Sequence, residues 1–275
     1  MRKLRVSNTI NNGMPHRAKA TRYLSCIFLI ISVTPGLSQG VTEENLSATE
    51  ANTKKLQLSN GLDEWDHVQL NKNVAANQFE ATLWDGQQAI KVQSRASMSL
   101  LARPIKVDLS ETPLLCWRWR IDAPLKAADM TTKAGDDYAA RLYVSLALPE
   151  AEKGFLLNAQ LAMARAIWGP QVPDAAINYV WDNRQPVGTE RPNAYTDRTT
   201  MVVLQSGPTR AGGWVNESRH LPKDMARLYS ANATPVQIAL AADTDNTGEA
   251  ATAGFTDIHF APESTGCTFP ASQNP

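Results

Sequence analysis

The clearest pattern along the chain is an alternation of apolar and polar residues in short stretches, with the period of two that is typical of β-strands. In the stretch 114–121, the residues that share the apolar face are Leu115, Trp117, Trp119 and Ile121. The residues of the opposite face are Cys116, Arg118 and Arg120. This alternation predicts a strand with one face packed in a core. Two tryptophans in register with leucine and isoleucine favour core packing over a sugar-stacking surface.

Further strands and two helices follow from the same analysis. Similar alternation predicts strands at 141–148, 236–241 and 255–260, and the stretch 200–205 is apolar on both faces, as in a central strand. Weaker patterns predict strands at 67–70, 79–84, 88–93 and 97–107. Helices are predicted at 153–169, before Gly169–Pro170, and at 223–230. We therefore expect a mainly β fold, an antiparallel jelly-roll-like β-sandwich with one or two short helical insertions.

The polar faces of these strands carry a set of charged and aromatic residues. They are Arg118, Arg120, Arg141, Tyr143, Asp257 and His259. On a curved sheet, such a face could form one concave binding surface. The alternative is an ordinary solvated face with ion pairs across neighbouring strands.

The first 38 residues predict a secretory signal peptide. Basic residues precede an apolar run at 23–33, and a segment rich in small residues follows. The run is shorter than the roughly 20 residues that a membrane span needs. We therefore expect a periplasmic or secreted protein without a membrane span after cleavage. The expected parts of the chain are a signal peptide at 1–38, a flexible lead-in at 39–57, a single β-sandwich domain at 58–262 and a flexible tail at 263–275.

Loss of the signal peptide changes the charge of the chain. The whole sequence holds 27 basic and 27 acidic residues, and six of the basic residues lie in the first 38 positions. The remainder has 21 basic and 27 acidic residues, a net charge of −6. This excess of acidic residues argues against a general nucleic-acid-binding protein. Two cysteines remain, Cys116 and Cys267; export would permit a disulfide, but the sequence does not fix whether they pair.

Four polar segments sit at the ends of predicted strands, where binding residues tend to lie. They are AGDDY (134–138), NYVWDNRQPVG (178–188), NAYTDR (193–198) and DTDNTGE (243–249). The candidate ligand-binding residues are Asp136, Asp137, Arg141, Trp181, Asp182, Asn183, Tyr195 and Arg198. An aromatic ring beside an acid and an amide is common in sugar sites. The alternative for 178–188 is a packed corner with Asx-turn hydrogen bonds.

The last of these segments is the candidate metal site. Asp243 and Asp245, with Thr247 and Gly248 behind them, match the opening of a calcium loop. The match is partial, because Gly254 stands where such a loop carries a glutamate. An Asx-rich turn closed by glycine is the alternative. Ca²⁺ is thus the one candidate cofactor, and none is required.

The sequence leaves open whether the protein is an enzyme. It contains no G-x-S-x-G or H-E-x-x-H motif. We consider three hypotheses: an exported binding module for a carbohydrate-like or other polar ligand, a polysaccharide hydrolase or lyase on a jelly-roll scaffold, and a structural envelope protein.

The motifs AGDDYAARLYV, NYVWDNRQPVGT, PNAYTDR and DTDNTGE, in this order, give the chain a resemblance to a known family. It resembles a bacterial family known as domain of unknown function 3047, over about residues 60–260. The resemblance implies a secreted or periplasmic single domain. It implies no activity, so no catalytic residue can be carried over.

Overall fold

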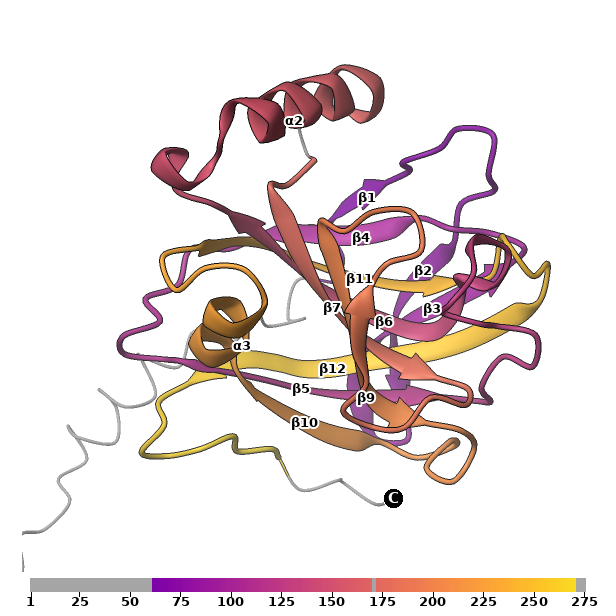
Figure 1. Cartoon of the computed structure of the whole chain (residues 1–275). Coiled ribbons are helices and arrows are strands. Elements are labelled where there is room, and N and C mark those ends of the chain that lie inside the picture. The colour runs from indigo at the N-terminus through magenta and orange to yellow at the C-terminus, as the bar shows by residue number, and fades with distance from the viewer. Residues whose placement is uncertain (1–60, 170–171, 271–275) are drawn as a thin grey trace, which may run out of the picture. The chain divides into compact units, whose positions relative to one another are not determined.

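The computed structural model describes residues 61–169 and 172–270, which form two β-sheets packed face to face (Figure 1). The predicted signal peptide and lead-in lie outside the described residues. The seven-stranded sheet has the strand order β1-β4-β11-β6-β7-β9-β8, and the five-stranded sheet has the order β10-β5-β12-β3-β2. The expected mainly β sandwich is confirmed, because the alternating strands bury their apolar faces between these two layers.

The bounds of the elements are as follows. The seven-stranded sheet contains β1 (Asp66–Val68), β4 (Leu100–Pro104), β6 (Tyr138–Ala147), β7 (Ala175–Asp182), β8 (Glu190–Pro192), β9 (Thr199–Ser206) and β11 (Thr234–Asp243). The five-stranded sheet contains β2 (Gln78–Trp84), β3 (Gln87–Arg95), β5 (Leu114–Ile121), β10 (Val215–His220) and β12 (Ala250–Ala261). The α-helices are α2 (Phe155–Trp168) and α3 (Leu221–Leu228), and short 3₁₀ turns lie at Lys133–Gly135 and Glu150–Glu152.

Two features of the sheets differ from the prediction. The sandwich is not antiparallel throughout, because β7 pairs with β9 in parallel. The segment 178–188 is not a loop along its whole length, since its first five residues belong to β7, which is buried in every position. The strands β8 and β10 carry no clear alternation of apolar residues and were not predicted.

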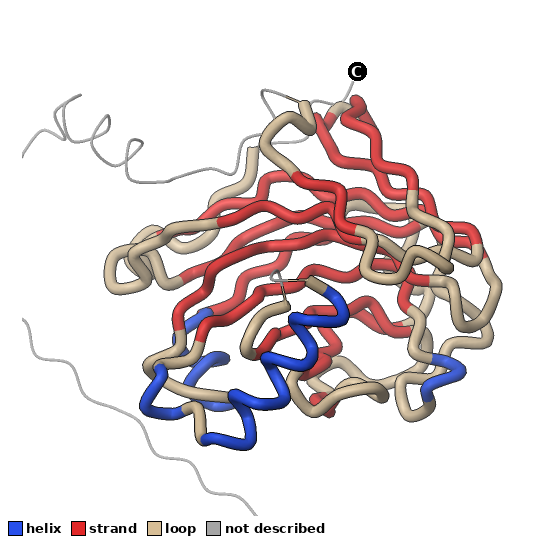
Figure 2. The backbone as a smooth tube through the Cα atoms, turned by 90° about the horizontal axis from the view of Figure 1, so that it is seen from above, coloured by secondary structure: helices blue, strands red, loops and turns tan. Residues whose placement is uncertain are grey.

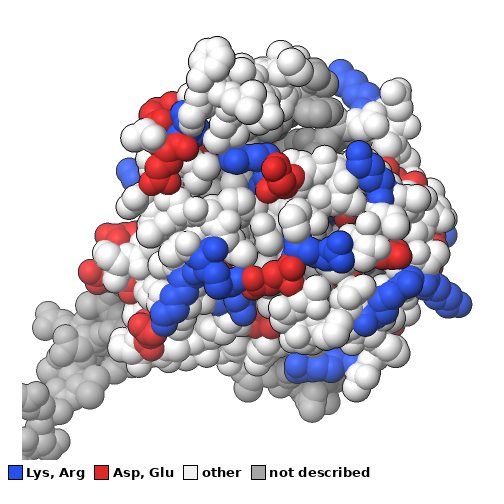
Figure 3. All heavy atoms as spheres, viewed as in Figure 1, with Lys and Arg blue, Asp and Glu red and all other residues white. Residues whose placement is uncertain are grey.

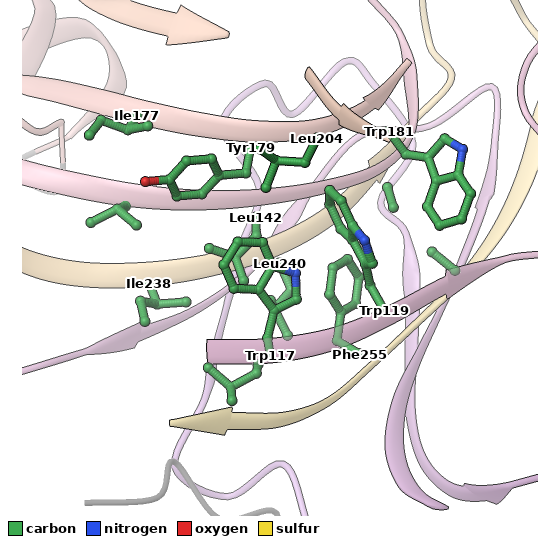
Figure 4. Close-up of a cluster of buried hydrophobic side chains, with 14 of the residues drawn as sticks. Trp117, Trp119, Leu142, Ile177, Tyr179, Trp181, Leu204, Ile238, Leu240 and Phe255 are labelled. Carbon is green, nitrogen blue, oxygen red and sulfur yellow. The ribbon is translucent and has the colours of Figure 1, made fainter. Parts of the chain in front are cut away.

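Aromatic rings from both sheets form the centre of the core (Figure 4). Trp117 and Trp119 of β5 are fully buried, as their alternation predicts. The Trp119 ring lies 5.7 Å from Trp117 on the same strand and 5.9 Å from Trp181 on the opposing sheet. The Tyr179 ring lies 5.4 Å from Trp117. These contacts hold the two sheets together through large apolar surfaces.

The polar faces do not join into one binding surface. Arg118 and Arg120 lie on the outer face of the five-stranded sheet, whereas Arg141 belongs to β6 in the other sheet. The prediction of a shared concave surface is therefore wrong. On the five-stranded sheet, Arg118 lies 3.3 Å from Asp257, and Arg120 pairs with Asp85. The ion pairs are those that the alternative expects, but the face is not solvated at this point, since Arg118 and Arg120 are buried.

Part of the segment expected to be a flexible tail is held against the five-stranded sheet. A disulfide joins Cys267 to Cys116 of β5. The Phe269 ring lies 5.1 Å from the Arg118 guanidinium and 5.7 Å from the His259 ring. Residues up to 270 are therefore anchored to the sandwich.

The two helices are tied to the sandwich by buried carboxylates. Figure 2 shows that α2 runs across the strands, where the helix lies over the outer face of the seven-stranded sheet. Lys153, two residues before α2, and Arg165 within α2 both bind Asp174, at 3.1 and 2.8 Å. In α3, Asp224 accepts hydrogen bonds from Tyr179 of the core and from Arg219 of β10. In the described part of the chain, no helix is long and apolar enough to cross a membrane.

Replacing Asp224 with asparagine is expected to make the stability of the protein less dependent on acid pH. Burial acts to raise the pKa of Asp224, but hydrogen bonds from Arg219 and Tyr179 outweigh it and hold the pKa below its usual value. The stabilising contribution is complete above the unfolded-state pKa of about 3.9 and is lost as pH falls through the lower folded-state pKa. Urea unfolding should show Asp224→Asn about 1–2 kcal/mol less stable than wild type at pH 7. The difference should shrink below about pH 4; a difference that is constant with pH would contradict this role.

Candidate functional site

Three of the four polar segments meet at one end of the seven-stranded sheet. The segment 134–138 leads into β6, and 243–249 leaves the neighbouring strand β11, so that Asp243 pairs with Tyr138 across the ladder. The loop 193–198 reaches the same place through Tyr195. Its hydroxyl donates to Asn246 Oδ1 at 2.6 Å and lies 2.9 Å from the Lys133 carbonyl oxygen. Antiparallel pairing of β6 with β11 thus brings together loops that are far apart in the sequence.

A group of carboxylates lies where these segments meet. Asp137, Asp243 and Asp245 each place one oxygen within 4.8 Å of the others. Asp136 is adjacent and accepts a hydrogen bond of 2.6 Å from Asn193 Nδ2. We call these four residues the acid cluster. All of its members except Asp245 are buried.

Arg141 is the buried cation beside this cluster. Its guanidinium pairs with Asp243 and lies 4.7 and 4.9 Å from the rings of Tyr138 and Tyr143. Asn178 of β7, with its amide oxygen turned towards the guanidinium, accepts from Nε at 3.0 Å and from Nη2 at 2.7 Å. These partners hold Arg141 inside the sheet. The residue would therefore act on a ligand through a neighbouring side chain and not by the direct contact that was predicted.

The charged form is disfavoured at two members of the cluster, Asp243 and Asp136. Burial raises the pKa of Asp243 well above its usual value; Arg141 opposes this shift, and the nearby Asp245 adds to it. Burial likewise raises the pKa of Asp136, again against Arg141. A carboxyl group that is shielded from water and faces other acids loses its charge more readily. Such groups are candidates for proton transfer or for binding a cation.

Asp137 has a clear structural role as well. Its Oδ2 accepts a hydrogen bond from the Thr247 amide at 2.7 Å, and its Oδ1 accepts from Asn246 at 3.2 and 3.3 Å. The side chain therefore holds the turn that follows β11 through hydrogen bonds between residues far apart in the sequence.

The fourth segment touches Arg141 through its first residue, Asn178, but its predicted ligand-binding residues, Trp181, Asp182 and Asn183, contact other parts of the chain. Trp181 is 1% exposed and faces the core, where its indole nitrogen donates to the Gly207 carbonyl at 3.0 Å. It cannot stack on a ligand there, so its predicted role is wrong. Asp182 Oδ1 accepts from the amides of Arg184 and Gln185 at 2.7 and 2.6 Å. Asn183 donates to the Ala128 carbonyl at 2.9 Å. These contacts match the packed-corner alternative, and a ligand role for Asp182 and Asn183 stays a prediction.

A cavity of about 600 Å³ lies between α2 and the outer face of the seven-stranded sheet. Its walls are mostly apolar: Leu157, Leu161 and Ala164 come from α2, and Leu100, Ala102, Ala176 and Ala239 come from the sheet. The polar lining residues include Tyr143, Ser145 and Gln237 of the sheet and Tyr195, Thr196, Asp197 and Arg198 of the loop. The sequence analysis missed this cavity. The alanines on the outward positions of β4, β7 and β11 were the available signal, because small side chains there leave room below a helix.

The loop 193–198 connects the cavity to the acid cluster. Tyr195 lines the cavity while its hydroxyl binds Asn246 of the turn after β11. Arg198 also lines the cavity, and its Nε donates to the Asp174 carbonyl at 2.8 Å. Two predicted ligand-binding residues thus lie at the cavity wall. On the face shown in Figure 3, basic and acidic side chains are mixed, with no extended patch of one sign.

Comparison with solved structures finds similarities at very low sequence identity. One is a structure described as "CBM4 structure and function", with 10% identity, a TM-score of 0.33, and coverage of 75% of this chain and 92% of that chain. Another is the xyloglucanase domain of NopAA, a type three effector from Sinorhizobium fredii, in complex with cellobiose. It has 8% identity, a TM-score of 0.40, and coverage of 72% of this chain and 93% of that chain. No curated protein sequence matches.

A family model matches residues 63–259, which include both sheets, α2, the acid cluster and the cavity. Its description is "Protein of unknown function (DUF3047)". This match covers most of the chain and confirms the resemblance of the four motifs: the chain belongs to the DUF3047 family.

Proposed function

We propose that this protein is an exported binding protein that holds a small ligand in the cavity under α2. The cavity itself carries the proposal. Its volume of about 600 Å³ lies within the range of about 300–1,000 Å³ that is common for small-molecule sites. Its composition is also common for such sites, since apolar walls surround a few polar groups that can orient a ligand.

The walls favour a ligand with an apolar body and a polar end. Leucines and alanines would contact the body, while Tyr143, Gln237 and Arg198 provide polar lining for the other end. The carbohydrate-like or other polar ligand that the sequence predicts fits less well. The indole expected to stack on a sugar ring is in the core, and most of the lining is apolar.

The disulfide supports the proposal of export. Disulfides persist in the periplasm and outside the cell, where thiols are oxidised. Cys116 and Cys267 are bonded in the folded domain. This bond agrees with a protein that a signal peptide directs out of the cytosol.

Catalysis has less support than binding. The carboxyl groups with raised pKa, Asp136 and Asp243, do not line the cavity. Tyr195 and Tyr143 stand at the cavity wall instead. A substrate in the cavity would therefore not meet the groups best suited to general acid catalysis.

Filling the cavity tests the proposal. The probe is 1-anilinonaphthalene-8-sulfonate, whose fluorescence rises in apolar surroundings. Ala164 lines the cavity from α2, so Ala164→Phe should place a ring inside and weaken dye binding at least about tenfold, which is about 1.4 kcal/mol. The matched control is Ala162→Phe, on the exposed side of the same helix, which should bind as wild type does.

Competition then separates the ligand classes. A medium-chain fatty acid should displace the dye from the wild-type protein, and a soluble oligosaccharide should not. Equal dye binding by the Ala164→Phe and Ala162→Phe variants would exclude the cavity as the site. Displacement by the oligosaccharide alone would instead support the carbohydrate-like ligand.

A further inference from the structure

The acid cluster holds more negative groups than the surrounding residues neutralise. Four aspartates lie together, and among the described residues the ion pair in the cluster is that between Arg141 and Asp243. Asp137 receives its hydrogen bonds from uncharged amide groups of Asn246 and Thr247. If the three buried carboxyl groups were all ionised, Arg141 would neutralise one of them and leave two buried negative charges, which is costly without a proton or a cation.

A second observation comes from one oxygen atom. Asp243 is 4% exposed, and its Oδ2 pairs with Arg141. Its other oxygen, Oδ1, is buried and has no hydrogen-bond partner in the described part of the chain. A buried carboxylate oxygen without a donor loses its hydration and gains nothing in exchange. The side chain is fixed by its ion pair with Arg141, and Asp243 is one of the three aspartates that each place one oxygen within 4.8 Å of the others.

We propose that Asp137, Asp243 and Asp245 bind Ca²⁺ in the mature protein. One oxygen from each residue lies within 4.8 Å of the others. Calcium binds oxygen ligands at about 2.3–2.6 Å, so ligands on opposite sides of one ion are separated by about 5 Å. The three oxygens therefore need little movement to reach a common ion.

The ligand chemistry selects the class of ion. The three side chains offer only carboxylate oxygens, with no histidine or cysteine in the group. Hard oxygen ligands favour calcium or magnesium over zinc or copper. Calcium also accepts irregular geometry and a variable number of ligands, which suits a turn held by Asp137 and by the end of β11.

The experiment is a calorimetric titration of the mature protein with CaCl₂ after treatment with a chelator, together with thermal unfolding with and without Ca²⁺. We expect one ion per chain and a higher Tm with calcium. Asp245→Asn removes one charge at the half-buried edge of the cluster and should weaken binding at least about tenfold. Asp122→Asn, an exposed acid outside the cluster, is the control and should bind calcium as wild type does.

A measurement without variants keeps the test independent of their folding. Tb³⁺ bound near Tyr138 or Tyr195 should show luminescence excited through a tyrosine ring, and Ca²⁺ should displace it. No calcium heat, no change in Tm and no Tb³⁺ signal in the wild-type protein would overturn the proposal. Unchanged binding by a folded Asp245→Asn variant would place the ion elsewhere and would equally overturn it.

Discussion

Replacing Trp119 with alanine is expected to lower the free energy of unfolding by about 3–5 kcal/mol. The side chain is fully buried and lies 5.7 Å from Trp117, 5.9 Å from Trp181 and 6.4 Å from Phe255, measured between ring centres. Its removal would leave a cavity between the two sheets, because neighbouring rings that pack on fixed strands can close the space only in part.

The same change affects a buried carboxyl group. The indole nitrogen of Trp119 donates to Glu217 Oε1 at 3.0 Å, and Gln205 donates to the same oxygen at 2.7 Å. Burial already raises the pKa of Glu217, and these two hydrogen bonds oppose the shift. In the Trp119→Ala variant, the pKa of Glu217 should therefore rise further. The loss of stability should be largest at pH values where Glu217 is ionised.

Urea unfolding followed by circular dichroism measures the effect of the Trp119→Ala substitution. The control is Phe155→Ala on α2, where the ring is 90% exposed, and its effect should lie within about 0.5 kcal/mol. Similar losses of unfolding free energy in the two variants would show that the effect of Trp119→Ala does not come from packing in the core.

Removing the disulfide is expected to cost about 2–5 kcal/mol. The bond closes a loop of 151 residues in sequence, between β5 and the segment that follows β12. A crosslink over a long loop restricts the unfolded chain, and its loss removes that restriction. In the folded protein the bond also holds Phe269 near Arg118 and His259.

The variant for this test is Cys116→Ala combined with Cys267→Ser, because Cys116 is buried and Cys267 is more exposed. Its midpoint of unfolding in urea should lie below that of oxidised wild type. Addition of a reductant should lower the wild-type midpoint towards that of the variant and should leave the variant unchanged. A variant as stable as the oxidised protein would show that the bond contributes nothing to folding.

The core of the sandwich could be predicted from local pattern alone. Strand β5 begins and ends at the predicted residues, and the choice of Trp117 and Trp119 as core side chains is confirmed. A strict period of two leaves little freedom, since a shift of one residue would turn Arg118 and Arg120 towards the space between the two sheets. The predicted helix at 153–169 also exists, at Phe155–Trp168.

The candidate site could be predicted only in part, because strand order is not a local property. The sequence shows that Asp137 and Asp243 lie at strand ends, but only the pairing of β6 with β11 brings them together. Trp181 was misplaced for a different reason. Ile177, Tyr179 and Trp181 alternate as a strand should, but the polar residues that follow Trp181 masked the pattern. The cavity depends on how α2 crosses the sheet, which no residue of the helix specifies by itself.

The order of the strands has a consequence for synthesis of the chain. The last two strands occupy internal positions, β11 between β4 and β6, and β12 between β3 and β5. Until residues 234–261 have left the ribosome, each sheet therefore has a gap near its middle and no complete sandwich can form. Domains whose contacts join distant parts of the chain fold slowly and late. For the export that we propose, such a delay would keep the polypeptide unfolded and competent for translocation until residues 234–261 have been made.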